Sequence, residues 1–407
     1  MIGTGVFTTS GFLLADLRSP WLVLATWAVG GVIAALGALN YGALARRIPE
    51  SGGEYLFLSR TLHPGAGYVA GWVSLLVGFS APLAAGAFAF GEYGKPWLPA
   101  WPARVSGTLL LIAFSVVHAA HVRRGAWLQN AAVVLKVVLI MLFAGFAVSR
   151  LKFTGETRAG SFPLSAFGVS LVWISFSYSG WNAAVYVGGE VRNPERNLPR
   201  ALLLGTALVT LLYLALNTVF VFAAPVEQLA GKLEIGRIAA EHLGGPTLAK
   251  AIGALVALTL VSFVSSMVMA GPRVCARMAA DGYLPRWLQA GQGPPRAAIY
   301  FQGGIAVILL WTATYQGLLT YIGFTLGLNT AATVLGLVRL RRREGASLRV
   351  PGWPWVPVLF LLSVLGMTVF SIARRPVESL VGLATIGVGL LAWRLSQQKG
   401  TTNRTEV

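Results

Sequence analysis

The sequence predicts an all-α integral membrane protein, a bundle of about twelve transmembrane helices, and three observations predict it. Of its 407 residues, 56% are hydrophobic and only 11% are charged. The mean hydropathy is +0.69, and a single soluble core cannot bury that much apolar surface. The apolar runs have the length of helices and do not alternate with polar residues, which favours a helical bundle over a β-barrel.

The elements follow from runs with no charge or almost none. A helix rises about 1.5 Å per residue, so roughly 20 residues cross a bilayer. The runs are 19–45, 61–91, 105–120, 125–149, 159–189, 201–226, 251–272, 297–338, 350–373 and 379–393. The run 297–338 holds two spans that join near 312–317. The opening stretch from Ile2 to Ala15 is half a helix, so we expect the first span to be truncated and roughly 10–40 further residues to precede it.

The net charge of +18 would indicate nucleic-acid binding in a soluble protein, so the position of the charges matters. If the chain starts in the cytoplasm, the loops on that side carry nearly twice as many Lys and Arg residues as the loops on the other side. The positive-inside rule then predicts a multi-pass protein of the inner or plasma membrane with both termini in the cytoplasm. The lipid bilayer is the expected surrounding, and no nucleic-acid partner is expected.

One cation, Lys136, lies inside a predicted span. It is 12 residues after Arg124 and 14 before Arg150, so about 18 Å of helix separates it from the nearer end. A lysine at this depth costs roughly 2.5–3.5 kcal/mol on insertion scales, so we expect it to face the bundle interior and mark a transport or coupling site. The alternative is a lysine that merely ties two helices together.

Two spans contain glycine or serine breaks. Gly3, Thr4 and Gly5 interrupt the first span, and the stretch 177–180 interrupts the sixth. The breaks are five spans apart, which is the offset expected of two five-helix repeats that cross the membrane in opposite senses. Matching breaks in such repeats indicate a central substrate site, whereas small residues alone would be equally typical of close helix packing.

The chemistry of such a site follows from the freed backbone. Amide groups at a helix start attract a carboxylate, and carbonyl groups at a helix end attract an ammonium. The sequence supplies no Asp or Glu in mid-span, so we expect no acidic side chain at the site. The residues Glu50, Glu54, Glu92, Glu190 and Asp281 all fall at or near span ends. An α-amino acid held by backbone dipoles is therefore a better candidate than a polyamine.

Several long stretches resemble the amino acid/polyamine/organocation transporter superfamily, most of all its L-type amino acid transporter branch. They are "MIGTGVF", "WAVGGVIAALGALNYGALARRIPESGGEYLFL", "FSYSGWNAAVYVGGEVRNPERNLPRAL", "PRVCARMAADGYLPRWL" and "RVPGWPWVPVLF". The resemblance implies a leucine-transporter-like 5+5 inverted-repeat bundle within a single domain over 1–395. Its repeats would cover 1–150 and 159–338, two additional helices would cover 350–395, and 396–407 would form a cytoplasmic tail.

The resemblance also implies site residues. Gly3, Thr4 and Gly5 match the turn whose amides hold the substrate carboxylate. The positions whose carbonyls take the ammonium are matched by Met1, Phe176, Ser177 and Ser179, and Trp181 and Asn182 follow in the same motif. Lys136 matches a fifth-span lysine that stands near the sodium position of relatives. The resemblance therefore implies a sodium-independent transporter of neutral L-amino acids that works by alternating access.

Other functions stay open at this stage. The chain has no convergent nucleophile, base or metal-ligand set, so we expect neither an enzyme nor a metal or other cofactor. One alternative is a transporter of another amine or polyamine, and a weaker one is a proton-translocating membrane subunit, which would need several buried ionisable groups. The sequence does not decide between exchange and proton symport, and it leaves the partner subunit unknown.

Overall fold

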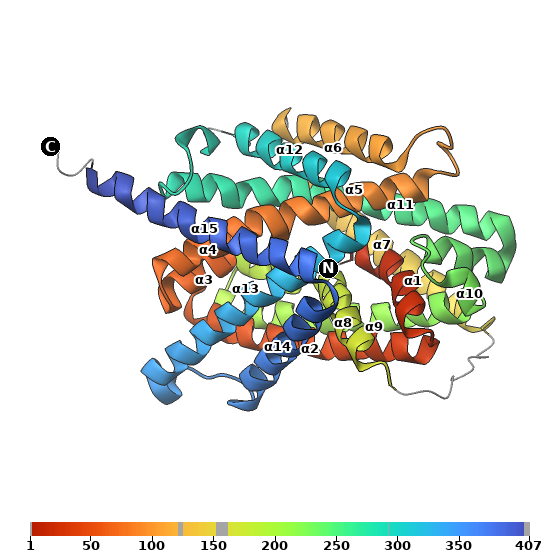
Figure 1. Cartoon of the computed structure of the whole chain (residues 1–407), viewed down its shortest axis with the longest axis horizontal. Coiled ribbons are helices and arrows are strands. Elements are labelled where there is room, and N and C mark those ends of the chain that lie inside the picture. The colour runs from red at the N-terminus through yellow and green to blue at the C-terminus, as the bar shows by residue number, and fades with distance from the viewer. Residues whose placement is uncertain (1, 121–124, 152–161, 292, 403–407) are drawn as a thin grey trace.

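The computed structural model describes residues 2–120, 125–151, 162–291 and 293–402, and within these ranges every regular element is a helix (Figure 1). Among the described residues, eight helices are long and apolar enough to cross a membrane, and four further apolar helices are shorter. The prediction of an all-α membrane protein is therefore confirmed. The number of crossings and the inverted repeat stay predictions. Below, "inner" denotes the ends that the positive-inside rule assigns to the cytoplasm, and "outer" the opposite ends.

The first part of the chain folds into seven α-helices and one π-helical segment. In order they are α1 (Gly5–Leu17), α2 (Pro20–Arg47), α3 (Gly53–Thr61), α4 (Pro64–Val73), η1 (Ser74–Ser80), α5 (Ala81–Gly94), α6 (Ala103–Ala120) and α7 (Gly125–Val148). Arg18 adopts a left-handed conformation that ends α1, and the Ser19 hydroxyl accepts a hydrogen bond from the Leu22 amide at the start of α2. The elements α4, η1 and α5 form one continuous long helix.

The second part contains the broken helix. Its elements are α8 (Leu164–Tyr178), η2 (Ala183–Glu190), α9 (Pro194–Phe222), α10 (Val226–Leu229), α11 (Ile235–Ala280), η3 (Arg286–Leu288), α12 (Arg296–Thr312), α13 (Tyr315–Glu344), η4 (Gly345–Ser347), α14 (Trp355–Arg374) and α15 (Pro376–Thr402). Within α11, Gly244 and Gly245 leave the helical conformation immediately before Pro246, so this element is two helices joined at a kink. Only two residues separate α12 from α13, which confirms the predicted join within 312–317.

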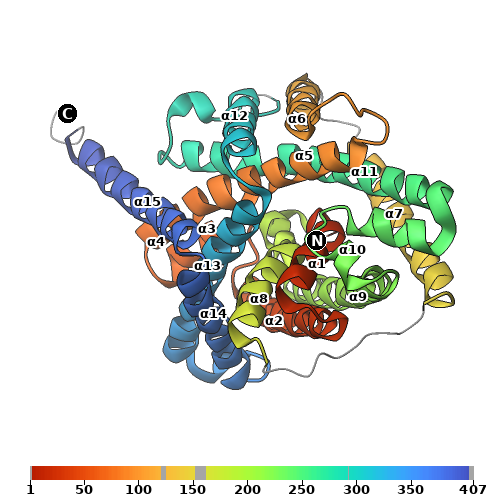
Figure 2. The same cartoon turned by 45° about the vertical axis from the view of Figure 1, so that its right-hand side comes forward.

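Helices that stand five predicted spans apart pack against one another. α1 contacts α8, α2 contacts α9, α5 contacts α11, and α6 contacts α12. Figure 2 shows α1, α2, α8 and α9 gathered in one group, with α6 and α12 beside each other at the far edge of the molecule. This pairing is the arrangement that two interlocked repeats would produce, and it brings the two interrupted segments, at α1 and α8, together.

A buried polar and aromatic network holds α1, α2, α8 and α9 together. The Trp27 indole donates to the Ser10 hydroxyl at 2.8 Å, and the Tyr178 hydroxyl donates to the Trp27 carbonyl at 3.0 Å. The Tyr213 hydroxyl donates to the carbonyl of Ser177 at 3.1 Å. Each of these rings is fully buried, so their hydrogen bonds satisfy polar groups that water cannot reach.

Candidate functional site

The break in the sixth predicted span lies between α8 and η2. After Tyr178 the chain turns extended at Ser179 (φ −52°, ψ 147°), and Gly180 has φ +91°, a conformation that favours glycine. The chain then continues as a 3₁₀ helix from Ala183. The interruption predicted at 177–180 is therefore present, shifted towards 179–182.

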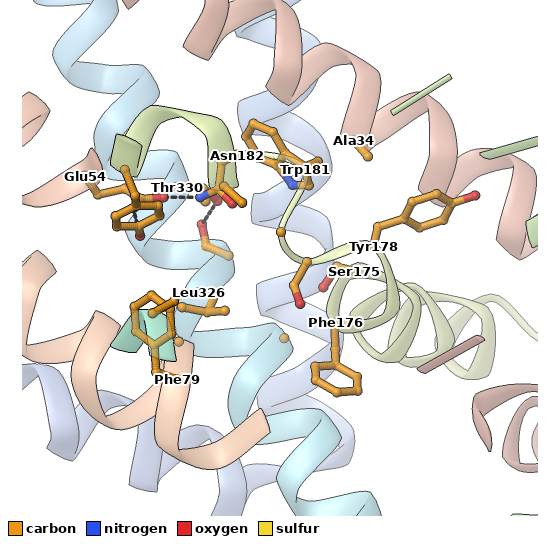
Figure 3. Close-up of a pocket in the computed structure, with 18 of the residues that line it drawn as sticks. Ala34, Glu54, Phe79, Ser175, Phe176, Tyr178, Trp181, Asn182, Leu326 and Thr330 are labelled. Atoms are coloured by element: carbon orange, nitrogen blue, oxygen red, sulfur yellow. Dashed lines mark hydrogen bonds between the residues drawn. The ribbon is translucent and has the colours of Figure 1, made fainter. Parts of the chain in front are cut away.

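A cavity of about 420 Å³ lies directly beside this break. This volume falls within the roughly 300–1,000 Å³ range that is typical of small-molecule sites. Four predicted site residues line it, namely Phe176, Ser179, Trp181 and Asn182. Figure 3 shows Phe176, Trp181 and Asn182 around the cavity, with the side chains of Phe79 and Leu326 on another side of it.

The cavity extends towards the inner end of the molecule. Its lining includes Ser51 and Gly52 from the α2–α3 loop, and Arg273 and Arg277 from the inner end of α11. The Arg277 side chain is 69% exposed, so the cavity reaches the surface on this side. The cavity is therefore open towards the inner end of the molecule, and we call this arrangement inward-facing on the basis of the positive-inside assignment.

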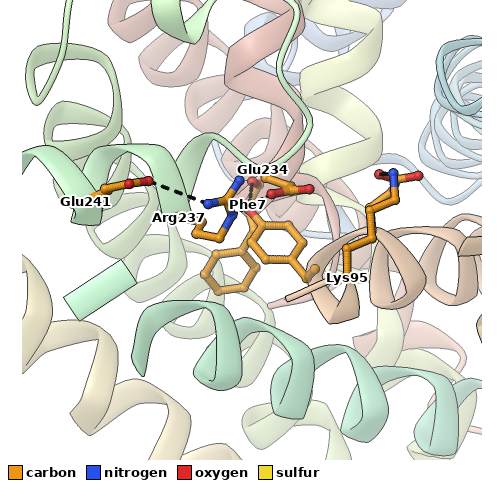
Figure 4. Close-up of polar contacts among 7 residues, drawn as sticks. Phe7, Lys95, Glu234, Arg237 and Glu241 are labelled. Atoms are coloured by element: carbon orange, nitrogen blue, oxygen red, sulfur yellow. Dashed lines mark hydrogen bonds and ion pairs between the residues drawn. The ribbon is translucent and has the colours of Figure 1, made fainter. Parts of the chain in front are cut away.

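The outer side is closed by α1 and the loop that follows α10. The Gly231 amide donates to the Gly11 carbonyl at 2.7 Å, and a Cβ atom on Gly11 would lie 1.9 Å from the Lys232 carbonyl oxygen. The Tyr93 hydroxyl also donates to the Phe7 carbonyl at 2.7 Å. Figure 4 shows Phe7 close to a set of ion pairs, in which Arg237 binds Glu234 and Glu241, and Lys95 binds Glu92.

The predicted residues of the first span lie behind the cavity wall. A Cβ atom on Gly5 would come within 2.4–2.6 Å of atoms of Ser177, so the start of α1 packs directly on α8. Ser177 is itself buried, and its hydroxyl lies 3.0 Å from the Thr9 hydroxyl. Gly3 packs on the Phe263 ring and Thr4 is 1% exposed. The described lining of the cavity includes none of Gly3, Thr4, Gly5 and Ser177.

Met1, the remaining member of the predicted set, lies outside the described residues. The structure thus divides the predicted residues into two groups. Phe176, Ser179, Trp181 and Asn182 line the cavity, whereas Gly3, Thr4, Gly5 and Ser177 lie behind its wall, where Gly5 and Ser177 form a contact between the two interrupted segments.

Lys136 is buried in the interior, as expected of a charged residue in mid-span. The residue is 6% exposed, and its Nζ donates to the Ser262 hydroxyl of α11 at 3.2 Å. It is absent from the cavity lining. Ser262 precedes Phe263, the residue that packs on Gly3, so α11 connects Lys136 to the turn at the start of α1.

Glu54 corrects one expectation. From the sequence it falls at a span end, and the site is expected to contain no acidic residue. In the structure Glu54 is 2% exposed and lines the cavity. Its carboxylate accepts hydrogen bonds from the Tyr41 hydroxyl at 3.0 Å, from the Asn182 amide and from the Tyr186 hydroxyl. The one sequence signal was the glycine pair immediately before it, which lets α3 begin in close contact with η2.

The site therefore offers hydroxyl, amide and carboxylate groups, aromatic walls and interrupted backbone. In the part of the chain that the structure describes, no group of three His, Cys, Asp or Glu side chains could hold a metal ion. The single cysteine, Cys275, is fully buried, away from the cavity lining. These groups are suited to reversible binding of a small polar molecule with an apolar part.

Comparisons with known proteins agree with this description. The sequence profile of the family described as "Amino acid permease" matches residues 1–391. The chain is 28% identical over 403 residues to the mouse b(0,+)-type amino acid transporter 1. This alignment covers 92% of this chain and 80% of the relative. It is also 28% identical over 410 residues to the mouse Asc-type amino acid transporter 1, with 96% of this chain and 77% of the relative covered. The rat Large neutral amino acids transporter small subunit 2 is 28% identical over 415 residues, with coverages of 96% and 76%.

Proposed function

The chain belongs to the amino acid permease family, and on that premise we propose that it is a sodium-independent secondary transporter of neutral L-amino acids. Members of this family and the relatives named above are transporters of amino acids, not enzymes. Alternating access moves the substrate, either by exchange or together with a proton. We place the protein in the inner or plasma membrane with both termini in the cytoplasm.

The observation that supports this proposal is the inward-facing cavity beside a broken helix. The ammonium of an amino acid would bind near the end of α8, where Phe176 and Ser179 face the cavity. Its carboxylate would bind at the amides of Gly3, Thr4 and Gly5, which lie behind the cavity wall, with Gly5 directly against Ser177. Binding would then require a small shift between α1 and α8 that admits the carboxylate.

The lining of the cavity also supports a neutral side chain. Phe79, Trp181, Met267 and Leu326 supply apolar wall. The carboxylate of Glu54 already accepts three hydrogen bonds, so it has little remaining capacity to pair with a cationic side chain. The lysine at position 136 supports sodium independence, because a second cation close to its ammonium would be repelled.

Competition for uptake into proteoliposomes tests the substrate class. Neutral L-amino acids should compete with a radiolabelled neutral amino acid, whereas their methyl esters and their decarboxylated amines should not, because each lacks one of the two charges. Replacing sodium with choline should leave uptake unchanged. Equal competition by an amine and its parent amino acid would overturn the zwitterion proposal, and a strict sodium requirement would overturn sodium independence.

Transport of an amine or polyamine is the second candidate, and Glu54 is the observation that favours it. A buried carboxylate on the cavity wall could pair with an organic cation if the cation displaced one of its three present donors. The same assay separates the two, because a polyamine permease would be inhibited by diamines and not by neutral amino acids. A family of amino acid permeases gives no support to a proton-translocating subunit.

A further inference from the structure

We propose that Glu54 is a positioning residue that fastens η2, the inner half of the broken helix, to α3 and so stabilises the inward-facing conformation. The inference rests on the proposed function only in taking the cavity beside the break as the substrate site. Glu54 would bind no substrate. It would set the position of Asn182 and of η2 at the inner mouth of the cavity (Figure 3).

The carboxylate of Glu54 joins three separate elements. Tyr41 belongs to α2, Asn182 to the segment between α8 and η2, and Tyr186 to η2 itself. None of the ion pairs between described residues includes Glu54, so these neutral donors alone compensate a carboxylate that is 2% exposed. Hydrogen bonds to a charged acceptor are the stronger kind, and an isolated buried carboxylate is strongly unfavourable. The charge therefore favours whichever conformation supplies all three donors.

The backbone around Glu54 is built to bring η2 close. Gly53 has φ +56°, and a Cβ atom on it would lie 2.4 Å from the Tyr186 ring, so only glycine fits there. The Gly189 amide donates to the Ser51 hydroxyl at 3.0 Å. A Cβ atom on Gly188 would lie 2.7 Å from the Pro49 carbonyl oxygen. The segment 49–54 thus lies along η2 from Tyr186 to Gly189, and Glu54 adds a carboxylate to this contact.

The next residue of α3 points to the opposite wall of the mouth. The Tyr55 hydroxyl donates to the Asp281 carboxylate at 2.8 Å, at the inner end of α11, and Arg277 binds the same carboxylate at 3.1 Å. Burial, together with the hydrogen bond to Asp281, raises the pKa of Tyr55, so the phenol stays a donor at neutral pH. The short helix α3 therefore spans the mouth, with Glu54 attached to η2 and Tyr55 attached to α11.

This arrangement predicts what happens when the carboxylate is removed. If η2 must move towards α11 to close the inner mouth, the Glu54 hydrogen bonds to Asn182 and Tyr186 must break, whereas its bond to Tyr41 within the α2–α3 unit can persist. Loss of the two bonds to the broken segment destabilises the inward-facing state relative to the outward-facing one. Even without a ligand, the cavity should then be less accessible from the inner side and more accessible from the outer side.

Thiol labelling of a cavity residue measures that shift without any substrate. The reporter is Thr330→Cys on α13, which lines the cavity, in a chain whose buried cysteine is removed by Cys275→Ala. A membrane-impermeant maleimide is applied to inside-out and to right-side-out vesicles. Glu54→Gln should lower the labelling rate from the inner side about fivefold or more and raise the rate from the outer side. Glu54→Asp, which keeps the charge on a shorter side chain, should restore part of the inner rate.

Two tyrosine variants form the matched control. Tyr186→Phe and Tyr41→Phe each remove one hydroxyl donor from the same carboxylate, but only Tyr186→Phe cuts a link to η2. Tyr186→Phe should reproduce the shift, and Tyr41→Phe should show less than half of it. If Glu54→Gln does not fold, the pair of tyrosine variants carries the test alone.

Two results would overturn the proposal. An unchanged ratio of inner to outer labelling in Glu54→Gln would show that the carboxylate does not favour the inward-facing state. Equal effects of Tyr41→Phe and Tyr186→Phe, in parallel with a lower melting temperature, would show that Glu54 only stabilises the fold. Because labelling requires no substrate, failure here is independent of whether neutral amino acids are transported.

Discussion

At the scale of single residues, two buried charges define the chemistry of the interior. In the described part of the chain, Glu54 and Lys136 are the charged residues that fall in the buried class. They lie in different places: Glu54 on the cavity wall with three neutral donors, and Lys136 between α7 and α11 with the Ser262 hydroxyl. A buried charge persists only where its surroundings compensate it or where function requires it.

Replacement of Lys136 is the first prediction at this scale. Lys136→Met keeps an unbranched side chain of similar length and removes the charge, so folding and membrane insertion should be retained or improved. If the lysine couples the start of α1 to transport, uptake per folded molecule should fall by roughly tenfold or more. The measurement is uptake into proteoliposomes, normalised to the monodisperse protein recovered.

Ser262→Ala is the control for Lys136→Met. It leaves the charge in place and removes one hydrogen bond, whose net contribution to stability is about 0.5–1.5 kcal/mol. Its effect on uptake should therefore be smaller than that of Lys136→Met. Loss of folded protein in proportion to lost uptake, in either variant, would show that Lys136 only ties α7 to α11.

At the scale of elements, the two interrupted segments have different neighbours at their ends. The outer part of α1 packs on the loop after α10 by direct backbone contact at Gly11 and Gly231. The inner half of the broken helix, η2, packs on the α2–α3 loop. The first contact closes the outer side, and the second holds η2 at the inner mouth of the cavity. Each relies on a glycine that lets two backbones approach closely.

Gly11→Ala should disturb the outer closure. The new Cβ atom would meet the Lys232 carbonyl oxygen at 1.9 Å, so α1 and the loop must separate, at a cost of about 1–3 kcal/mol. Labelling of the Thr330→Cys reporter from the outer side should rise, and active transport should fall. The matched control is Gly205→Ala in α9, where the new methyl group would meet no described atom within 4 Å beyond the backbone of its own helix, and no change is expected. Identical behaviour of the two variants would contradict the closure.

At the scale of the whole molecule, the arrangement of the helices determines where the break and the cavity lie. The helices pack in pairs, and this packing places the break near the centre of the bundle. The pairs are α1 with α8, α2 with α9, α5 with α11, and α6 with α12. The helices α14 and α15 lie outside these pairs, and α15 projects from the body in both views (Figures 1 and 2). Among the described residues, the cavity lining extends to the inner end of the bundle, so the orientation in the membrane decides which compartment the cavity faces.

The orientation is tested by cysteines at the two ends. In the chain with Cys275→Ala, Lys95→Cys should react with an impermeant maleimide only in right-side-out vesicles, and Ser347→Cys only in inside-out vesicles. Both positions are exposed in the structure, so access is not limited by folding. The reverse pattern would place the termini outside, and the cavity would then face the exterior.

Local features of the sequence determined the helices and the position of the break. Glycine and serine in mid-span weaken a helix whatever surrounds them, so the interruption at Ser179 and Gly180 could be predicted from the residues alone. In the same way, the depth of Lys136 in a long apolar run predicted that its charge is buried. These properties depend on neighbours within a few turns of the same helix.

The environment of Glu54 was decided by the tertiary structure. Asn182 and Tyr186 are 128 and 132 positions away along the chain, and no periodicity in α3 indicates that η2 will cover its first turn. The same holds for Gly3, Thr4 and Gly5, whose separation from the cavity depends on how tightly α1 packs on Ser177 in this conformation. Burial depends on the surfaces that folding brings together. From the sequence alone, a charged residue at the start of a short helix is therefore predicted to be exposed, because the distant residues that cover it are not evident there.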